Sequence, residues 1–287
     1  MLKIIILLFV IVITGCQREE VAEVFDISNL SSVEIINNDS GPFSSERLFG
    51  EIDYGSLIDN YNKGDHRAAY VYAINLFKGY KFDKNQDKGI EILESLWKQG
   101  VVDAGYSLFQ IYYLGLGVPE NKDVAAKYLK LSADAGYINS QRKLGYIYAD
   151  RDEVKMFKKN LSQSLYWFKR AAENGDKVAA LNVAGMYREG MGIKPNSEKS
   201  FEWLEKIPEM PYGDLMTGFP ALGNYYEQGI GTDVDLIQAY KYFSLVQPAK
   251  AVDRQRVANK MSDKELEIAN EMVEKWKERN NIVVPNG

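Results

Sequence analysis

Apolar residues recur at helical spacing on both sides of a glycine-containing loop near the middle of the chain. Ala104, Leu108 and Tyr112 are four residues apart, which places them on one face of a helix. Residues 115–119 carry two glycines and a proline, which predict a tight turn. The inward face of a second helix then comprises Ala125, Tyr128, Ser132 and Ala133. Two short helices cannot bury this stripe alone, so we expect neighbours of the same kind.

The same pattern recurs along the chain at a nearly constant spacing. The positions equivalent to Ala104 are Ala68, Ala104, Ser140, Ala179 and Gly218. By subtraction they are 36, 36, 39 and 39 residues apart. A tyrosine at the loop entry recurs as Tyr112, Tyr148, Tyr187 and Tyr226. Self-similarity at this period predicts an all-α fold, an α-solenoid of about five helix-turn-helix repeats, instead of a compact single core.

The repeated residues resemble those of a known family. The loop pattern is most complete in ALGNYYEQGIGT (Ala221–Thr232), and the end of the second helix in WFKRAAENG (Trp167–Gly175). Both resemble the Sel1-like repeat, a relative of the tetratricopeptide repeat. The resemblance implies a solenoid that binds other proteins. The third copy departs from the pattern, because its loop (Ala149–Gln163) lacks the glycines and is about three residues longer.

The beginning of the chain, MLKIIILLFVIVITGC, predicts export. One lysine precedes an apolar run from Ile4 to Ile13, which is short for a bilayer span and typical of a secretory signal. Ile13–Cys16 resembles the lipobox of bacterial lipoproteins. The resemblance implies that Cys16 is acylated, that the lipid holds the mature chain on the periplasmic face of a membrane, and that Gln17 favours the outer membrane. An ordinary signal peptide, or a membrane anchor with an incidental cysteine, is the alternative.

The segment after Cys16 is rich in serine, asparagine and acidic residues, without a helical stripe, as in a flexible tether. A short strand is possible at Val33–Ile36, although the sequence indicates no partner for it. A capping box at Ser262 and Glu265 marks the start of a last helix. We therefore divide the chain into a lipoprotein signal peptide (1–15), an acylated cysteine and flexible tether (16–50), a repeat solenoid (51–261), and a C-terminal capping helix and tail (262–287).

The composition offers little catalytic chemistry. The formal net charge is −5 with mixed signs, which argues against nucleic acid as a partner. Cys16 and His66 are the only cysteine and histidine, so a zinc site or a Ser-His pair lacks donors, and we expect no metal or cofactor. We expect His66 to be a solvated loop residue. Ser95–Lys98 and Ser140–Lys143 match the Ser-x-x-Lys motif of penicillin-binding enzymes. Neither match has an accompanying Lys-Thr-Gly or Ser-Asp-Asn, so an enzyme acting on cell wall or β-lactam is disfavoured.

The first helix of each unit has positions that the packing stripe does not use. They lie two, six and nine residues after the alanine-equivalent position, and by analogy with related solenoids they line the concave face. Tyrosine and arginine are favoured at binding hot spots. The predicted partner-binding residues are Tyr70, Phe77, Tyr106, Tyr113, Arg142, Tyr146 and Arg188. Packing against the next unit is the alternative explanation for these side chains.

Two non-catalytic functions fit the sequence best. The first is a membrane-anchored module that binds an envelope assembly protein on its concave face. The second, which rests on a resemblance to the immunity partners of some secretion-delivered phospholipases, is an immunity lipoprotein that neutralises an effector delivered into the periplasm. The sequence does not choose between these partners.

Overall fold

The computed structural model describes residues 32–36, 49–50, 53–246 and 250–282. Cys16 and the predicted signal peptide lie outside these residues. The described chain is helical apart from turns and two isolated β-bridges. Its helices are α2 (Leu57–Asn62), α3 (His66–Lys78), α4 (Gln86–Lys98), α5 (Val102–Leu114), α6 (Lys122–Asp134), α7 (Ile138–Ala149), α8 (Leu161–Glu173), α9 (Lys177–Glu189), α10 (Ser197–Lys206), η3 (Ile207–Glu209), α11 (Phe219–Gln228), α12 (Leu236–Leu245), α13 (Ala251–Ala258) and α14 (Asp263–Arg279).

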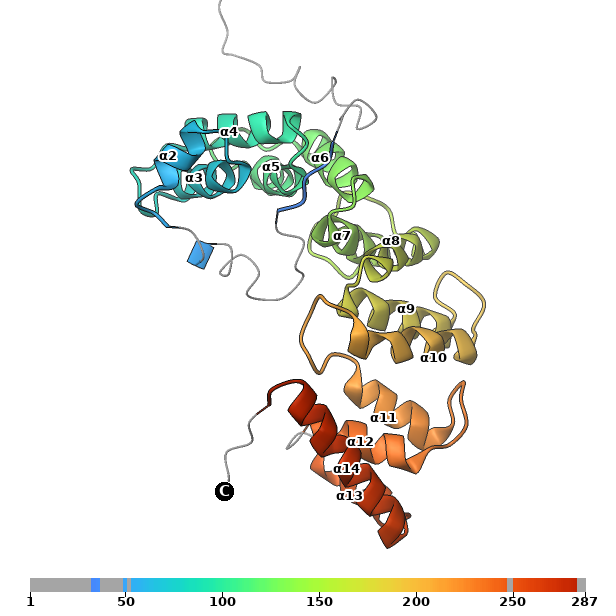
Figure 1. The fold of residues 1–287 in the computed structure, drawn as a ribbon. Coiled ribbons are helices and arrows are strands. Elements are labelled where there is room, and N and C mark those ends of the chain that lie inside the picture. The colour runs from blue at the N-terminus through green and yellow to red at the C-terminus, as the bar shows by residue number, and fades with distance from the viewer. Residues whose placement is uncertain (1–31, 37–48, 51–52, 247–249, 283–287) are drawn as a thin grey trace, which may run out of the picture.

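Consecutive helices form hairpins that stack into a curved array (Figure 1). The hairpins are α3/α4, α5/α6, α7/α8, α9/α10 and α11/α12, and from α4 to α12 each second helix packs against the helix that follows it. The predicted all-α solenoid of about five repeats is therefore confirmed. The short helix α2 packs on α3 at one end, and α13 and α14 pack on α12 at the other.

Each second helix starts at a polar cap. In each case the cap's side-chain oxygen accepts a hydrogen bond from the backbone N–H three residues further on. These caps are Asn85, Asn121, Asn160, Asn196 and Asp235. The backbone N–H of Asn121 also donates to the carbonyl of Tyr112 at 2.8 Å, so one residue both starts α6 and fixes the loop from α5.

The third hairpin keeps this geometry although its loop lacks the usual glycines. Asp150 ends α7 in the left-handed conformation (φ 60°). Gly115 ends α5 in the same conformation (φ 64°) in the preceding hairpin. A left-handed aspartate is less favourable than a left-handed glycine. Lys155 donates to the Asp150 carboxylate at 2.5 Å, within the same longer loop.

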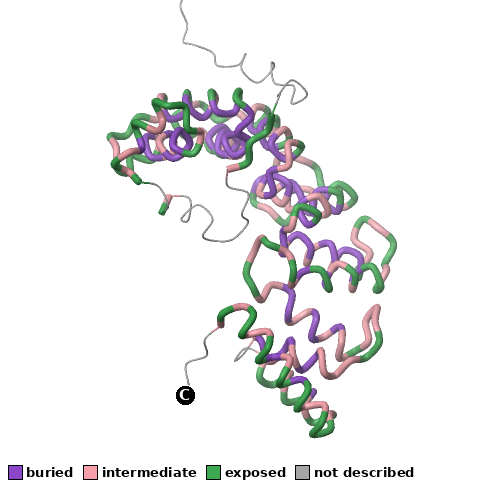
Figure 2. The backbone as a smooth tube through the Cα atoms, viewed as in Figure 1, coloured by how far each residue is buried: buried purple, intermediate pink, exposed green. Residues whose placement is uncertain are grey.

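The buried residues run through the facing sides of successive helices (Figure 2). Ala104, Leu108 and Tyr112 are all buried, as their spacing predicts. In α14 the capping box of Ser262 and Glu265 is present, and Ala269 and Val273 are buried. No helix among the described residues is long and apolar enough to cross a membrane.

Candidate partner-binding groove

A groove follows the inner side of the array across α3, α5 and the loop after α7. Its first part is a cavity of about 530 Å³ lined by Tyr70, Phe77 and Tyr106 together with Leu114 and Leu116. Its second part, about 620 Å³, is lined by Tyr113, Arg151 and Asp152. Gln110 and Leu114 line both parts. We call the surface made by Phe77, Gln110, Tyr113, Leu114 and Leu116 the inner groove.

The inner groove exposes apolar side chains. Leu114 is 59 % exposed and Leu116 is 38 % exposed, while Phe77, Tyr106 and Tyr113 are partly exposed. Neither leucine is among the binding residues predicted from the sequence, because both lie in the last turn of α5 and the following loop, beyond the positions two, six and nine residues after Ala104. The signal that could have found them is an apolar residue on either side of the loop glycine Gly115.

Two of the predicted binding residues pack mainly within the array. Tyr70 is buried, its hydroxyl lies 3.0 Å from Ser107 Oγ, and burial raises the pKa of its phenol. Tyr146 meets the Phe168 ring edge-on at 5.0 Å, and its hydroxyl accepts a hydrogen bond from Asn182. Packing against neighbouring elements explains both rings.

Arg142 holds two units together. Its Nη1 donates to Asp176 Oδ2 at 2.7 Å, and its Nη2 donates to Asn139 Oδ1 at 3.0 Å. Asp176 is fully buried and caps α9, accepting the N–H of Ala179 at 2.7 Å. Arg188 is exposed on α9, where its guanidinium carbon lies 5.8 Å from the centre of the Tyr225 ring. The structure therefore brings Tyr70, Phe77, Tyr106 and Tyr113 to one groove, and neither Arg142 nor Arg188 lines it.

Residues 32–36 of the predicted tether contact the array, which corrects the tether interpretation for this segment. The N–H of Glu34 donates to Gly100 O at 2.9 Å, and its carbonyl accepts the N–H of Val102 at 3.1 Å. The N–H of Ile36 donates to the Asp103 carboxylate at 2.8 Å. Where the sequence allowed a short strand at Val33–Ile36 without a partner, Glu34 forms an isolated parallel bridge with Val101, between α4 and α5.

His66 is not the solvated loop residue expected from the sequence. It opens α3, its Nδ1 bonds the Glu34 carboxylate, and its Nε2 lies 3.2 Å from Gln99 Oε1. Two oxygen acceptors suit a ring with a proton on both nitrogens. The hydrogen bond to Glu34 is the main reason why the pKa of His66 is raised, and partial burial opposes it.

In both Ser-x-x-Lys matches the serine forms a hydrogen bond with a neighbouring residue of the array. Ser140 is fully buried, and its hydroxyl donates to Ser132 Oγ at 2.9 Å, while Lys143 pairs with Asp152. The exposed Ser95 accepts a hydrogen bond from Gln99. Among the described residues no group of three or more histidine, cysteine or acidic side chains could hold a metal ion.

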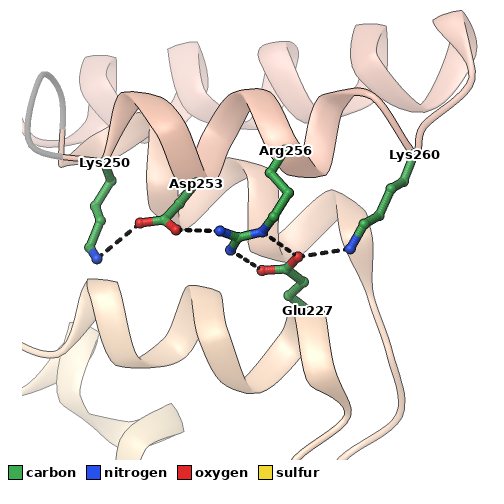
Figure 3. Close-up of polar contacts among 5 residues, drawn as sticks. All are labelled: Glu227, Lys250, Asp253, Arg256 and Lys260. Carbon is green, nitrogen blue, oxygen red and sulfur yellow. Dashed lines mark hydrogen bonds and ion pairs between the residues drawn. The ribbon is translucent and has the colours of Figure 1, made fainter.

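The C-terminal end of the array carries an ion-pair cluster (Figure 3). Glu227 occupies the position in α11 that Phe77 and Tyr113 occupy in α3 and α5. Its carboxylate accepts from Arg256 Nε at 3.0 Å and from Lys260 at 2.9 Å, and its side chain is only 5 % exposed. Arg256 also pairs with Asp253. Glu227 thus fixes α13 to the last repeat.

Three fungal proteins are among the curated proteins that are similar to part of this chain. Activator of C kinase protein 1 of Saccharomyces cerevisiae is 37 % identical over 28 % of this chain and 14 % of its own length. Chitin synthase regulator SKT5 of the same yeast is 27 % identical over 56 % of this chain and 23 % of its own length. Chitin synthase regulatory factor 3 of Schizosaccharomyces pombe is 32 % identical over 62 % of this chain and 19 % of its own length. The chain therefore spans less than a quarter of each relative.

Solved structures of similar fold are also repeat proteins. One is c5321, a protective antigen of uropathogenic Escherichia coli with an SLR fold (TM-score 0.60, 24 % identity, 82 % of this chain and 52 % of that one). Another is a Sel1 repeat protein from Oxalobacter formigenes (TM-score 0.55, 22 % identity, 73 % of this chain and 82 % of that one).

The Sel1 repeat model matches four segments, residues 102–137, 138–176, 177–207 and 221–245. These segments correspond to the hairpins from α5/α6 to α11/α12, and the second segment includes the longer loop between α7 and α8. Sel1 repeats are protein–protein interaction modules. Residues 102–207 and 221–245 therefore form four Sel1 repeats, and the solenoid fold is shared with solved structures of Sel1-repeat proteins.

Proposed function

We propose that this protein is a non-catalytic, lipid-anchored module that binds a protein partner in its inner groove on the periplasmic side of a bacterial membrane. The observation that carries the proposal is the set of exposed apolar side chains in the groove, above all Leu114 and Leu116. Contiguous apolar surface with aromatic rings is typical of protein-binding sites, and a solenoid presents such a surface across several repeats.

The membrane attachment in this proposal rests on Cys16. A single acyl chain binds membranes only weakly, so stable attachment needs more than one chain at this cysteine. The test is a Cys16→Ser chain, which should still be exported and should leave the membrane fraction after a high-salt wash. Retention in the membrane fraction would contradict the anchor.

Site-specific crosslinking tests the groove. A photoreactive residue at Leu114 should capture a discrete protein in intact cells. The matched control is a photoreactive residue at Val252, which is 81 % exposed on α13 and outside the groove. Equal capture at both positions, or none at position 114, would contradict the proposal.

The identity of the captured protein then separates the two partners that the sequence left open. An effector from a rival cell would make the protein an immunity protein, and its loss should then sensitise cells only when that effector reaches the periplasm. A resident assembly protein would make it a scaffold, and its loss should alter the envelope without any effector.

A further inference from the structure

Two junctions between repeats bind an extended segment in the same way. Between α4 and α5, Gly100 O accepts from Glu34 N–H and Val102 N–H donates to Glu34 O, at 2.9 and 3.1 Å. Between α8 and α9, Gly175 O accepts from Tyr212 N–H and Lys177 N–H donates to Tyr212 O, at 3.1 and 2.9 Å. Both are parallel bridges. At these two junctions, the backbone between consecutive repeats therefore pairs with an extended segment.

The local conformation explains this pairing. A left-handed glycine (Gly100, φ 90°; Gly175, φ 95°) ends one helix, and an extended residue (Val101 or Asp176) precedes the next. The glycine carbonyl and the N–H two residues later then both face the added strand. The strand comes so close that a Cβ on Gly100 would lie 2.2 Å from Ser32 O.

Around the first junction, the array contacts side chains of the extended segment as well as its backbone. His66 bonds the Glu34 carboxylate, Gln99 contacts the His66 ring, and the Asp103 carboxylate accepts the N–H of Ile36. Glu34 and Ile36 lie on the same side of the extended segment, and Ile36 packs against the hydrophobic core. The occupant that fits has a carboxylate and, two residues later, an aliphatic side chain.

We propose that this junction, made by His66, Gln99, Gly100, Val102 and Asp103, is a docking site for an extended strand of a partner protein, which Ser32–Ile36 occupies in cis. Addition of a strand to an unpaired backbone is a recurrent mode of peptide recognition. In the cis segment, Val33 and Ile35 remain 42 % and 36 % exposed. A partner strand with the same carboxylate and aliphatic pattern displaces it.

This inference rests on the proposed function for the existence of a partner, but it concerns a different surface from the inner groove. The probe is a fluorescent peptide with the sequence of residues 31–37, SSVEIIN, and the receptor is the full chain with Cys16→Ser. A Glu34→Pro substitution removes the N–H that Gly100 accepts, so it releases the cis segment. An Ile35→Pro substitution is the matched control, because no described contact uses the Ile35 N–H.

We expect the peptide to bind the Glu34→Pro chain at least tenfold more tightly than the Ile35→Pro chain. A peptide with Gln in place of its Glu, or with a scrambled sequence, should bind at least tenfold more weakly. Equal binding to both chains, or equal binding of the scrambled peptide, would overturn the inference. A wild-type dimer that Glu34→Pro dissolves would also overturn it, because the occupant would then be a second copy.

A second pair of variants locates the peptide. Gly100→Ala places a methyl group against the docked strand, whereas Gly64→Ala imposes a similar left-handed strain (φ 85°) at a junction where no described atom lies within 4 Å of the added Cβ. Added to Glu34→Pro, only Gly100→Ala should abolish peptide binding, with similar melting temperatures for both chains. Loss in both chains would contradict the location. Failure of the peptide with intact capture at Leu114 would remove this inference alone.

Discussion

The two ends of the array use equivalent positions in opposite ways. Nine residues after the alanine-equivalent position, the first two units carry Phe77 and Tyr113, which line cavities on the inner side. The last unit carries Glu227 there, and its nearly buried carboxylate binds Arg256 and Lys260. One end leaves this position open to a ligand, and the other uses it to fix the terminal helices.

This difference shows what the repeat determines and what it leaves open. The repeat determines the polar caps of the second helices and the small residues between helices, and both ends have them. The repeat does not fix the residues at the inner positions, so each unit can use them separately, for a groove, for an ion pair between units as at Arg142, or for a terminal cap.

The largest expected effect tests the scaffold that the two ends share. Ala104 and Ala239 are both fully buried, one near each end. Ala104→Glu and Ala239→Glu each bury a charge without a partner and should each cost about 4 kcal/mol or more of unfolding free energy. Circular dichroism melts measure this, with Gln110→Glu on the exposed side of α5 as the control. Tolerance of either buried glutamate would reject the common packing.

The second prediction separates residues that hold units together from residues that are free to bind. Arg142→Ala leaves the buried Asp176 carboxylate without its guanidinium and should cost about 3 kcal/mol. Arg188→Ala, on the exposed side of α9, should change stability by less than about 0.5 kcal/mol. Urea unfolding of both variants gives the comparison. An unaffected Arg142→Ala chain would return Arg142 to the candidate binding residues.

The third prediction concerns the closed end and its pH dependence. The hydrogen bond from Arg256 is the main cause that lowers the pKa of Glu227 below its ordinary 4.5. The resulting stability is present above pH 4.5 and is lost as the pH falls through the lowered pKa. Glu227→Gln should cost about 1–2 kcal/mol at pH 7 and should flatten this acid dependence. Melts between pH 3 and pH 7 measure it, and the same acid dependence in both chains would contradict the role of Glu227.

The smallest expected effect concerns the docked segment at the open end. His66 faces Glu34 and Gln99, with Asp65 on its own helix and Lys88 and Glu91 on α4 around the adjoining cavity. Because its pKa is raised, the contribution of His66 to docking is complete below pH 6.5 and is lost as the pH rises through the raised value. His66 is the only histidine, so its NMR signal is unambiguous. Its pKa should move back toward 6.5 in Glu34→Gln, and an unchanged pKa would contradict the contact.

The sequence predicted the parts of this structure that depend on repetition. Spacing located the hairpins, and the capping box at Ser262 located the start of the last helix, because it depends on residues within one turn. The contact of Glu34 with Val101 joins residues 67 positions apart without any periodic signal, so the sequence could not reveal it. The same limit applies to Arg142, whose buried partner Asp176 belongs to the next repeat.

The most direct test of the account is the affinity of the partner captured at Leu114 for variants of the two ends, measured by calorimetry. We predict that Tyr113→Ala with Leu114→Ser weakens binding at least tenfold, and that Val234→Ser with Val252→Ser, which changes exposed apolar residues of the C-terminal end, leaves it unchanged. Both chains should melt like the wild type. Intact affinity in the first chain, or a comparable loss in the second, would contradict the claim that the N-terminal inner groove is the binding surface.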